Sequence, residues 1–228
     1  MTALLILLLL AALLGFLARR LLRLCRRANE ADWGSPWLNR LDGLNRLFCR
    51  KFHRLRHDDL RLPERGGVLL ASNHVSGLDP LLLIAAARRP LRFVIAREQY
   101  ARWWLQWLFR AAGCIPLERG RHPRAALRAV REALARGEVV ALFPQGGIRL
   151  DHEPTRPLKR GVALLARMTG APVVPVRLTG VRGQGRTVSA VFLRSRVRLR
   201  GFEPLYFAEP AADNLLMELG ELLSGKRV

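Results

Sequence analysis

Short apolar runs alternate with helical stretches along the chain beyond Pro63, and this alternation constrains the fold more than any other feature. The runs predict strands at Val68–Ala71, Leu91–Ala96, Cys114–Leu117, Val139–Phe143, Val173–Leu178, Val188–Leu193 and Val197–Phe202. The stretches between them predict helices at Pro80–Ala87, Glu98–Ala112, Pro123–Arg136 and Leu158–Thr169. This order indicates an α/β domain with a single, largely parallel central sheet flanked by helices. Only residues 194–196 separate the last two predicted strands, so we expect these two to form an antiparallel hairpin.

The amino terminus begins with an unbroken apolar segment. Residues 3–18 contain no polar side chain, and five arginines follow between Arg19 and Arg27. A cleaved signal peptide carries its positive charge before the apolar run, so the reverse order here predicts an uncleaved membrane anchor. The positive-inside rule then places the rest of the chain on the cytoplasmic face of the cell's inner membrane. The alternative is a core helix that is buried in the domain.

A second helical pattern covers residues 36–56, where Leu and Phe recur at helical spacing and arginines fill the other face. It fits an amphipathic helix at the membrane interface, and it also fits an ordinary surface helix. We expect a membrane-associated segment at residues 1–57 and the α/β domain at residues 58–228. His53 and His57 have a spacing that can hold a metal, but no further Cys or His pair follows, and we expect no metal site.

The chain is strongly basic, with 39 basic and 18 acidic side chains and a formal net charge of +21. Such a surface attracts nucleic acid, anionic membranes or phosphorylated ligands. The basic residues are dispersed and form no recognised nucleic-acid motif, so the net charge is the only feature of the sequence that supports a nucleic-acid partner. Three widely spaced cysteines provide neither a disulfide framework nor a cysteine-based zinc site.

The sharpest motif is Asn73-His74-x4-Asp79, which follows the first predicted strand. Open α/β sheets place their functional sites at the carboxyl ends of strands. A loop can fold Asp79 against the imidazole, and a carboxylate that holds a His makes it a general base with a fixed tautomer. The competing interpretation is that Asp79 and Pro80 only begin a helix, because Asp as N-cap and Pro at the first helical position are both favoured.

Three further segments carry candidate site residues. Residues 143–147 place a Pro-Gln-Gly-Gly turn after a strand, with Arg149 and Lys159 behind it, and such a turn with cations and a helix start can form a phosphate cradle. The segment Gly113–Arg119 ends a short strand with another arginine. Pro175 interrupts an apolar strand, which indicates a sheet edge, a bulge or a wall that faces a ligand.

In this order the four segments resemble the glycerolipid acyltransferase family, and in particular its bacterial lysophosphatidic acid (1-acylglycerol-3-phosphate) acyltransferases. The family's blocks are Asn-His-x4-Asp, Gly-x5-Arg, Phe-Pro-Glu-Gly-Thr-Arg and a Val-Pro-Val strand, and the resemblance covers roughly residues 60–180. It implies that His74 and Asp79 are the catalytic pair. The residues that it implies for the acceptor phosphate are Arg119, Arg149 and Lys159. Those that it implies for the substrate pocket are Asn73, Pro144, Gln145, Gly146, Gly147 and Pro175.

The sequence departs from the family pattern at two positions in the third block. Gln145 stands where Glu is usual, and Arg149 lies one position later than the family's Arg. These departures leave the acyl-transfer class intact and leave the headgroup of the acceptor open. The tryptophan-rich stretch Glu98–Ala112 resembles the family's membrane-facing helix, and the alternative is a buried aromatic cluster.

The resemblance implies an enzyme that moves a fatty acyl group from acyl-coenzyme A or acyl carrier protein to the hydroxyl of lysophosphatidic acid. The product would be phosphatidic acid, and no cofactor or metal would take part. Its expected partners are the lysophospholipid acceptor, the acyl donor and anionic membrane lipids, without nucleic acid. The alternatives are another lysophospholipid or lysolipid acceptor, a family member that binds lysolipid without turnover, and a membrane-tethered nucleic-acid-binding protein.

Overall fold

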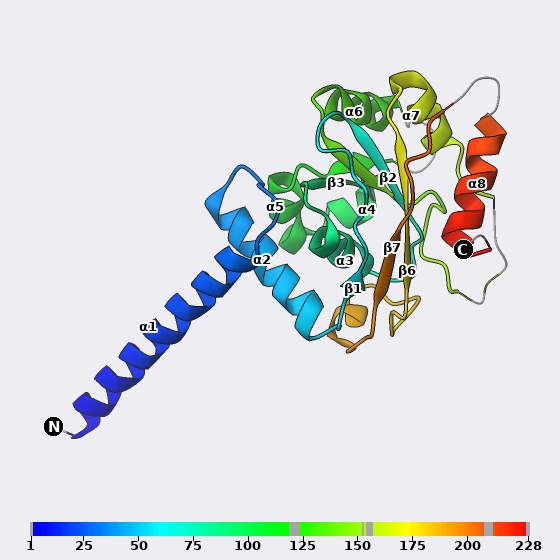
Figure 1. The fold of residues 1–228 in the computed structure, drawn as a ribbon. Helices are drawn as coiled ribbons and strands as arrows, with labels where there is room; N and C mark the ends of the chain where they lie inside the picture. Colours follow the sequence, from blue (N-terminus) through cyan, green and yellow to red (C-terminus); the bar gives the residue numbers. More distant parts are fainter. Residues whose placement is uncertain (1, 119–123, 152, 154–156, 208–211, 227–228) are drawn as a thin grey trace.

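A computed structural model describes residues 2–118, 124–151, 153, 157–207 and 212–226 of the chain. Two helices precede an α/β domain, which confirms the predicted fold class. Helix α1 (Thr2–Ala28) projects from the body as a single rod (Figure 1). Helix α2 (Pro36–Lys51) crosses the base of α1 and lies between it and the domain.

The centre of the domain is a seven-stranded sheet in the order β1-β7-β6-β2-β5-β3-β4. Its strands are β1 (Arg56–His57), β2 (Val68–Ser72), β3 (Leu91–Ala96), β4 (Ile115–Leu117), β5 (Val139–Leu142), β6 (Val173–Thr179) and β7 (Arg198–Gly201). Strands β2 to β6 run parallel, β7 pairs antiparallel with β6, and β1 runs parallel to β7. Strand β2 lies between β5 and β6 and is buried along its whole length. Its carboxyl end therefore lies at the middle of the side of the sheet where the parallel strands end.

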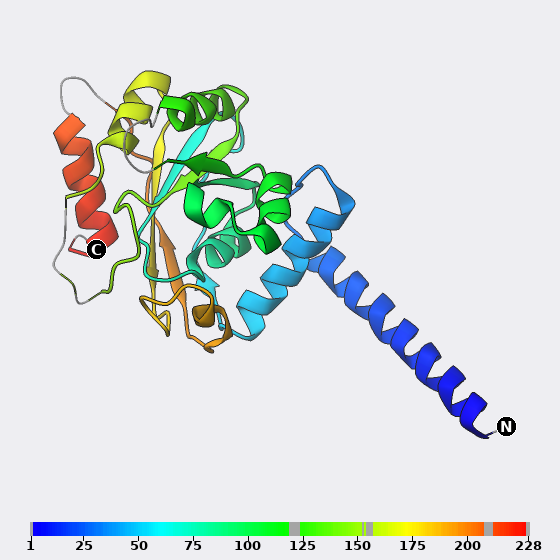
Figure 2. The ribbon, with the colours of Figure 1, turned by 180° about the vertical axis from the view of Figure 1, so that it is seen from behind.

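Helices cover both faces of the sheet, and neighbouring residues of β2 point to opposite faces. Leu70 belongs to the core under α3 (Asp79–Ala86) and the end of α2. Leu69 belongs to the core under α6 (Arg124–Ala135), α7 (Gly161–Thr169) and α8 (Ala212–Ser224). Figure 2 shows the same layers from behind, with these last three helices on the side away from α2.

Two predicted elements were wrong. Residues 188–193 contain a 3₁₀ helix, η1 (Ser189–Phe192), in place of a strand, so the predicted hairpin does not form. Strand β7 instead takes the free edge of β6, where Leu199 becomes fully buried. The helix predicted at Glu98–Ala112 is split into α4 (Arg97–Tyr100) and α5 (Trp103–Ala111). Strand β1 and helix α8 were not predicted.

Helix α1 is exposed along most of its length. Leu4–Ala28 is long and apolar enough to cross a membrane, and Leu14 keeps 66% of its surface exposed. The alternative of a buried core helix is therefore wrong. Among the residues of α1 from 4 onward, those that are buried against the body are Cys25 and Ala28, at the end of the helix. Twenty-seven residues at ~1.5 Å each exceed the ~30 Å thickness of the hydrocarbon core.

Helix α2 buries only part of its predicted apolar face, together with polar residues. Its buried residues are Leu38, Asp42, Gly43, Arg46 and Cys49. Leu41 and Leu44, which belong to the predicted apolar face, remain exposed. Helix α2 therefore packs through a partly polar face and leaves these two leucines exposed.

Candidate active site

His74 and Asp79 meet directly after β2. Nδ1 of the imidazole lies 2.8 Å from Oδ2 of Asp79, whose carboxylate is fully buried. The His74 side chain keeps 17% of its surface exposed. An ionised carboxylate only accepts hydrogen bonds, so this contact favours the tautomer with the proton on Nδ1 and the acceptor lone pair on Nε2. The pair can therefore remove a proton from a hydroxyl that reaches Nε2.

Three groups besides the imidazole donate hydrogen bonds to Asp79. The N–H groups of Val75 and Ser76 donate to Oδ2 at 2.6 and 2.9 Å, and the Ser76 hydroxyl donates to Oδ1 at 2.8 Å. Helix α3 begins at Asp79 itself, and Leu78 is its N-cap. The interpretation of Asp79 as a simple helix cap is therefore wrong. Its carboxylate turns back onto the loop and holds that loop around the imidazole.

Asn73 continues the sheet by one residue through its side chain. Its Nδ2 donates to the Leu178 carbonyl at 2.9 Å, and its Oδ1 accepts the Leu178 N–H at 2.7 Å. The side-chain amide thus replaces a backbone pair between β2 and β6. Because Asn73 is buried and both ends of its amide are engaged, this predicted pocket residue positions the strand end that carries His74.

The loop after β5 holds His74 from three directions. The Phe143 ring stacks on the imidazole with a centroid distance of 3.9 Å and an interplanar angle of 13°. Oε1 of Gln145 accepts the His74 N–H at 2.9 Å, and the Arg149 N–H donates to the His74 carbonyl at 2.7 Å. The first and third sequence blocks, 71 residues apart, therefore form one site.

Gln145→Met is expected to lower kcat by at least about tenfold, because misplacing a catalytic group by about 1 Å can cost up to ~10²-fold. Methionine fills the same space but cannot accept the His74 N–H, and an unpaired buried donor costs about 1–3 kcal/mol. Gln145→Glu keeps an acceptor of the same reach and should retain activity. The measurement is kcat together with the melting temperature. Wild-type kcat in the Met variant would show that this hydrogen bond does not position His74.

Arg149 is the only described member of the predicted pair of phosphate-binding arginines. Its side chain is 30% exposed, and its Nη1 lies 3.5 Å from Oε2 of Glu153. A phosphate that binds Arg149 must compete with this carboxylate. Arg119, the other arginine of the pair, lies outside the described residues.

Lys159 lies over the glycine turn. Gly146 has φ 77°, a left-handed conformation that favours glycine, and a Cβ there would come within 3.0 Å of Cε of Lys159. At Gly147 an added Cβ would have no described atom within 4 Å. The Lys159 N–H donates to the Pro144 carbonyl at 2.8 Å. The lysine is therefore fixed at its backbone and exposes its charge beside the turn.

A further loop, residues 180–187, borders the site and was missed in the sequence. The Gly185 N–H donates to the Val75 carbonyl at 2.8 Å, and the Gly77 N–H donates to the Arg186 carbonyl at 3.0 Å. This loop therefore braces the segment between His74 and Asp79 from the side of β6. The signal available in the sequence was a glycine-rich basic turn directly after a strand.

Pro175 does not mark a sheet edge, because β6 lies between β2 and β7. Its carbonyl accepts the Phe202 N–H at 3.0 Å, on the side of β7. The β6–β7 ladder begins at the next residue, Val176, so the missing N–H of proline falls at the end of that ladder. Pro175 is buried beside Ala71 of β2.

Two cysteines and two histidines outside the site lie among the described residues with burial or local contacts that account for them. Burial raises the pKa of Cys114 to about 11 and that of Cys49 to about 12, so both thiols stay protonated at neutral pH. His53 is buried, its Nε2 lies 3.1 Å from the Val191 carbonyl, and burial lowers its pKa. Nδ1 of His57 lies 3.1 Å from the Asp58 carbonyl. The two imidazoles therefore contact different carbonyls and do not share one metal position.

Helix α5 exposes its tryptophans. Trp103 keeps 85% and Trp107 57% of its surface exposed, and Trp104 is also exposed. The ring of Trp37 on α2 lies 5.8 Å from that of Trp107. The alternative of a buried aromatic cluster is therefore wrong, and the two helices form an exposed aromatic surface near the base of α1. Exposed tryptophans of this kind are enriched at bilayer interfaces.

A cavity of about 660 Å³ lies at the opposite end of the parallel strands from His74. Gly67 and Pro172, which line it, directly precede β2 and β6. The cavity therefore opens at the amino ends of the strands. Because open α/β sheets bind ligands at the carboxyl ends, we place the site at His74 and not in this cavity.

Comparison with known proteins identifies the family of the chain. The profile of a protein family described as Acyltransferase matches residues 54–179, which is more than half of the chain. The chain is a member of this acyltransferase family. The match includes the segment from His74 to Asp79, the loop after β5 and strand β6.

Relatives within the family share modest identity with the chain. The 1-acyl-sn-glycerol-3-phosphate acyltransferase of Bacillus subtilis is 26% identical over 149 residues, which cover 65% of this chain and 71% of that protein. A probable 1-acyl-sn-glycerol-3-phosphate acyltransferase of Mycoplasma pneumoniae is 28% identical over 60% of this chain, and the match spans about half, 53%, of that protein. The crystal structure of the 1-acyl-sn-glycerophosphate (LPA) acyltransferase PlsC from Thermotoga maritima superposes with a TM-score of 0.64 at 21% identity. That superposition covers 85% of this chain and 81% of the other.

Proposed function

We propose that this acyltransferase moves a fatty acyl group from an acyl thioester to the free hydroxyl of lysophosphatidic acid and so forms phosphatidic acid for phospholipid biosynthesis. The observation that carries the proposal is the 2.8 Å contact between His74 and Asp79 at the carboxyl end of β2. Membership of the family supports the reaction class. The names of the relatives in Bacillus subtilis and Mycoplasma pneumoniae support the acceptor.

In the proposed step the hydroxyl of the lysolipid gives its proton to Nε2 of His74 while its oxygen attacks the thioester carbonyl carbon. The Asp79 carboxylate, which accepts hydrogen bonds from four donors, stabilises the imidazolium. The tetrahedral intermediate then collapses, the carbon–sulfur bond breaks, and the leaving thiolate takes the proton from His74. The products are the new ester and a free thiol, and no cofactor or metal enters the step.

The acceptor phosphate is proposed to bind beside this pair. Arg149 and Lys159 are anchored next to His74 through the loop after β5, and Arg119 is proposed as a third ligand. A guanidinium can bind two phosphate oxygens at once, whereas an ammonium acts as a point charge. The turn formed by Pro144, Gln145, Gly146 and Gly147 is proposed as the pocket wall.

Arg149→Ala is expected to raise the KM for lysophosphatidic acid by about 10–100-fold, which corresponds to a charge-assisted hydrogen bond of about 1.5–3 kcal/mol. Arg149→Lys should restore only part of the affinity, because the bidentate fork is lost. Glu153→Gln removes the competing carboxylate and should lower the KM. The measurement compares lysophosphatidic acid with lysophosphatidylcholine, which has no phosphate monoester. An equal loss with both acceptors would instead identify a structural arginine.

Helix α1 is proposed to anchor the enzyme in the inner membrane, with the catalytic domain on the cytoplasmic face. The arginines that follow the apolar run support this orientation, since positive charge favours the cytoplasmic side and attracts anionic lipids. The exposed tryptophans of α5 are proposed to rest at the headgroup level. Such an arrangement keeps the site where both amphiphilic substrates reside.

The direct test uses the purified full-length chain in vesicles, with acyl-coenzyme A and acyl carrier protein as alternative donors. Lysophosphatidic acid is offered beside other lysophospholipids, and EDTA is included to test the proposed independence from metals. We expect phosphatidic acid to form, and His74→Ala to abolish most of it. Turnover of a different lysolipid alone would correct the acceptor. Tight lysolipid binding without turnover would show a family member that binds but does not catalyse.

A further inference from the structure

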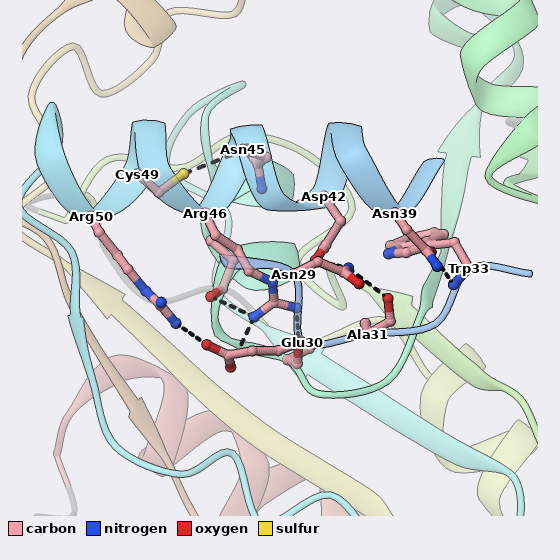
Figure 3. A network of polar contacts seen from close by, with 12 residues as sticks. Asn29, Glu30, Ala31, Trp33, Asn39, Asp42, Asn45, Arg46, Cys49 and Arg50 are labelled. Carbon is pink, nitrogen blue, oxygen red and sulfur yellow. Dashed lines mark hydrogen bonds and ion pairs between the residues drawn. The ribbon is translucent and has the colours of Figure 1, made fainter. Parts of the chain in front are cut away.

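Arg46 is a fully buried cation where the two N-terminal helices meet α3 (Figure 3). Its Nε lies 2.6 Å from Oδ2 of Asp42, and its Nη1 lies 3.2 Å from Oε2 of Glu30. Nη1 also donates to the Ala85 carbonyl at 3.1 Å, and Nη2 donates to the Ala87 carbonyl at 2.5 Å. A buried cation requires such partners, because an unpaired charge is strongly unfavourable in the protein interior. One side chain therefore connects three segments of the chain.

The segment that follows α1 is tied to α2 by polar bonds. Nδ2 of Asn29 donates to Oδ2 of Asp42 at 2.8 Å. Glu30 accepts from Arg50 at 2.5 Å in addition to its contact with Arg46. Figure 3 shows Glu30 and Asn29 on the segment below α2, where they face Arg46, Arg50 and Asp42 of that helix. The end of the anchor helix is thus held by the same carboxylates that hold Arg46.

The backbones of α1 and α2 also touch directly. A Cβ at Gly43 would lie only 1.8 Å from the Cys25 carbonyl oxygen, so only glycine allows this approach. Cys25 is buried in the contact. By contrast, a Cβ at Gly15 of α1 would have no described atom within 4 Å. Helix α1 is therefore fixed at its base and free of the body further out.

We call the contact region of α1, α2 and α3 around Arg46 the joint. Its third element, α3, carries Asp79 of the catalytic pair at the end away from Arg46. Helix α3 begins at Asp79, and Arg46 binds carbonyls at and just beyond its last turn. Eight residues at ~1.5 Å each make a rigid link of about 12 Å. Asp79 is also held by its own loop, so the catalytic pair does not need Arg46 in order to form.

We propose that Arg46 is a positioning residue that locks α1, α2 and α3 into one unit and thereby holds the His74–Asp79 site at a fixed height and angle over the bilayer that α1 enters. This inference rests on the proposed function, since it assumes an anchored acyltransferase with a substrate in the membrane. A reacting hydroxyl must come within about 3–3.5 Å of its partner atom. A loose joint would let the domain tilt on its anchor and spoil that geometry only for substrates held in a bilayer.

Two variants loosen the joint without touching the site. Gly43→Ala forces α1 away from α2 and leaves every charge in place, and Gly15→Ala is its matched control on the exposed part of α1. The second variant combines Arg46→Met with Asp42→Asn. It removes the ion pair as a whole, because removing Arg46 alone would leave a buried carboxylate unpaired. Melting temperatures establish that each variant is folded.

Activity is measured with two acceptors, long-chain lysophosphatidic acid in vesicles and a short-chain analogue that stays monomeric in water. We expect Gly43→Ala and the double variant to lower kcat/KM on vesicles by at least about tenfold and to keep activity on the monomeric acceptor within about twofold, since misplacement by about 1 Å can cost up to ~10²-fold. Gly15→Ala should match the wild type with both acceptors.

A second readout does not depend on turnover. All five tryptophans lie between residues 33 and 107, and Trp37, Trp103, Trp104 and Trp107 are exposed. Brominated lipids should therefore quench their fluorescence in the wild type and in Gly15→Ala, and should quench it less in the two joint variants. Unchanged quenching and vesicle activity, or an equal loss with both acceptors, would overturn the proposal. A wild type that is inactive with both acceptors would instead refute the proposed function, and the quenching would still test the joint.

Discussion

Replacement of His74 by alanine is expected to lower kcat by about 10²–10⁴-fold, the usual contribution of a positioned acid–base group. The variant loses the group that takes the proton from the attacking hydroxyl. The fold should survive, because the His74 side chain is partly exposed and its backbone is bound by Gln145 and Arg149. The measurement is kcat at saturating acceptor, with the melting temperature as control. Retention of most activity in a folded His74→Ala enzyme would exclude His74 as the base.

Asp79 provides the complementary test of the same pair. Its carboxylate is surrounded by four donors, so an asparagine amide would bring a fifth donor group into the cluster. Asp79→Asn should therefore lose activity and also about 1–3 kcal/mol of stability for the polar group left unpaired. If Asp79→Asn stays fully active while Asp79→Ala only lowers the melting temperature, Asp79 has no catalytic part.

Helices and strands whose own residues carry a clear apolar pattern were predicted well. Strand β3 has the predicted bounds, Leu91–Ala96, because an apolar run between polar turns favours a buried strand wherever it pairs. Strand β1 was missed because its two residues, Arg56 and His57, have no apolar pattern and are ordered by pairing with β7, far along the chain. Residues 188–193 were read as a strand because short apolar runs do not distinguish strands from short helices.

The same distinction between local and distant information applies to the site. His74 and Asp79 are five residues apart, so one loop brings them together and the motif reveals the pair. The acceptor for the His74 N–H comes from Gln145, 71 residues away, and only the pairing of β2 with β5 makes it a neighbour. Arg46 lies on a helix whose arginines suggested a solvated face, yet its guanidinium is buried and donates to carbonyls at and just beyond the end of α3.

The intact protein is expected to remain with membranes in 1 M salt and to leave only with detergent. Between residues 4 and 18 the helix carries nine leucines, one isoleucine and one phenylalanine, and those leucines are exposed in the structure. At roughly 0.3–0.6 kcal/mol each, these apolar residues together favour insertion by roughly 3–7 kcal/mol. Attraction of the flanking arginines to anionic lipids adds about 1 kcal/mol per residue near the surface. Salt screens only this second contribution.

Deletion of residues 1–18 should therefore convert retention in 1 M salt into release, while low salt still allows some binding. The truncation stops before Cys25 and Ala28, since both pack on the body and their loss would unfold the joint with α2. Residual binding at low salt would come from Arg19, Arg20 and Arg23 together with the exposed tryptophans of α5.

A charge variant separates the two contributions. Replacing Arg19, Arg20 and Arg23 by glutamine in the full-length chain weakens the screened attraction but leaves the apolar helix, so this variant should stay with membranes in 1 M salt as the wild type does. The measurement is the fraction that sediments with vesicles at low and high salt. The Debye length is only about 3 Å at 1 M salt, so an electrostatic attachment cannot persist there. Full release of the intact protein by salt alone would therefore show that exposed α1 does not enter the bilayer.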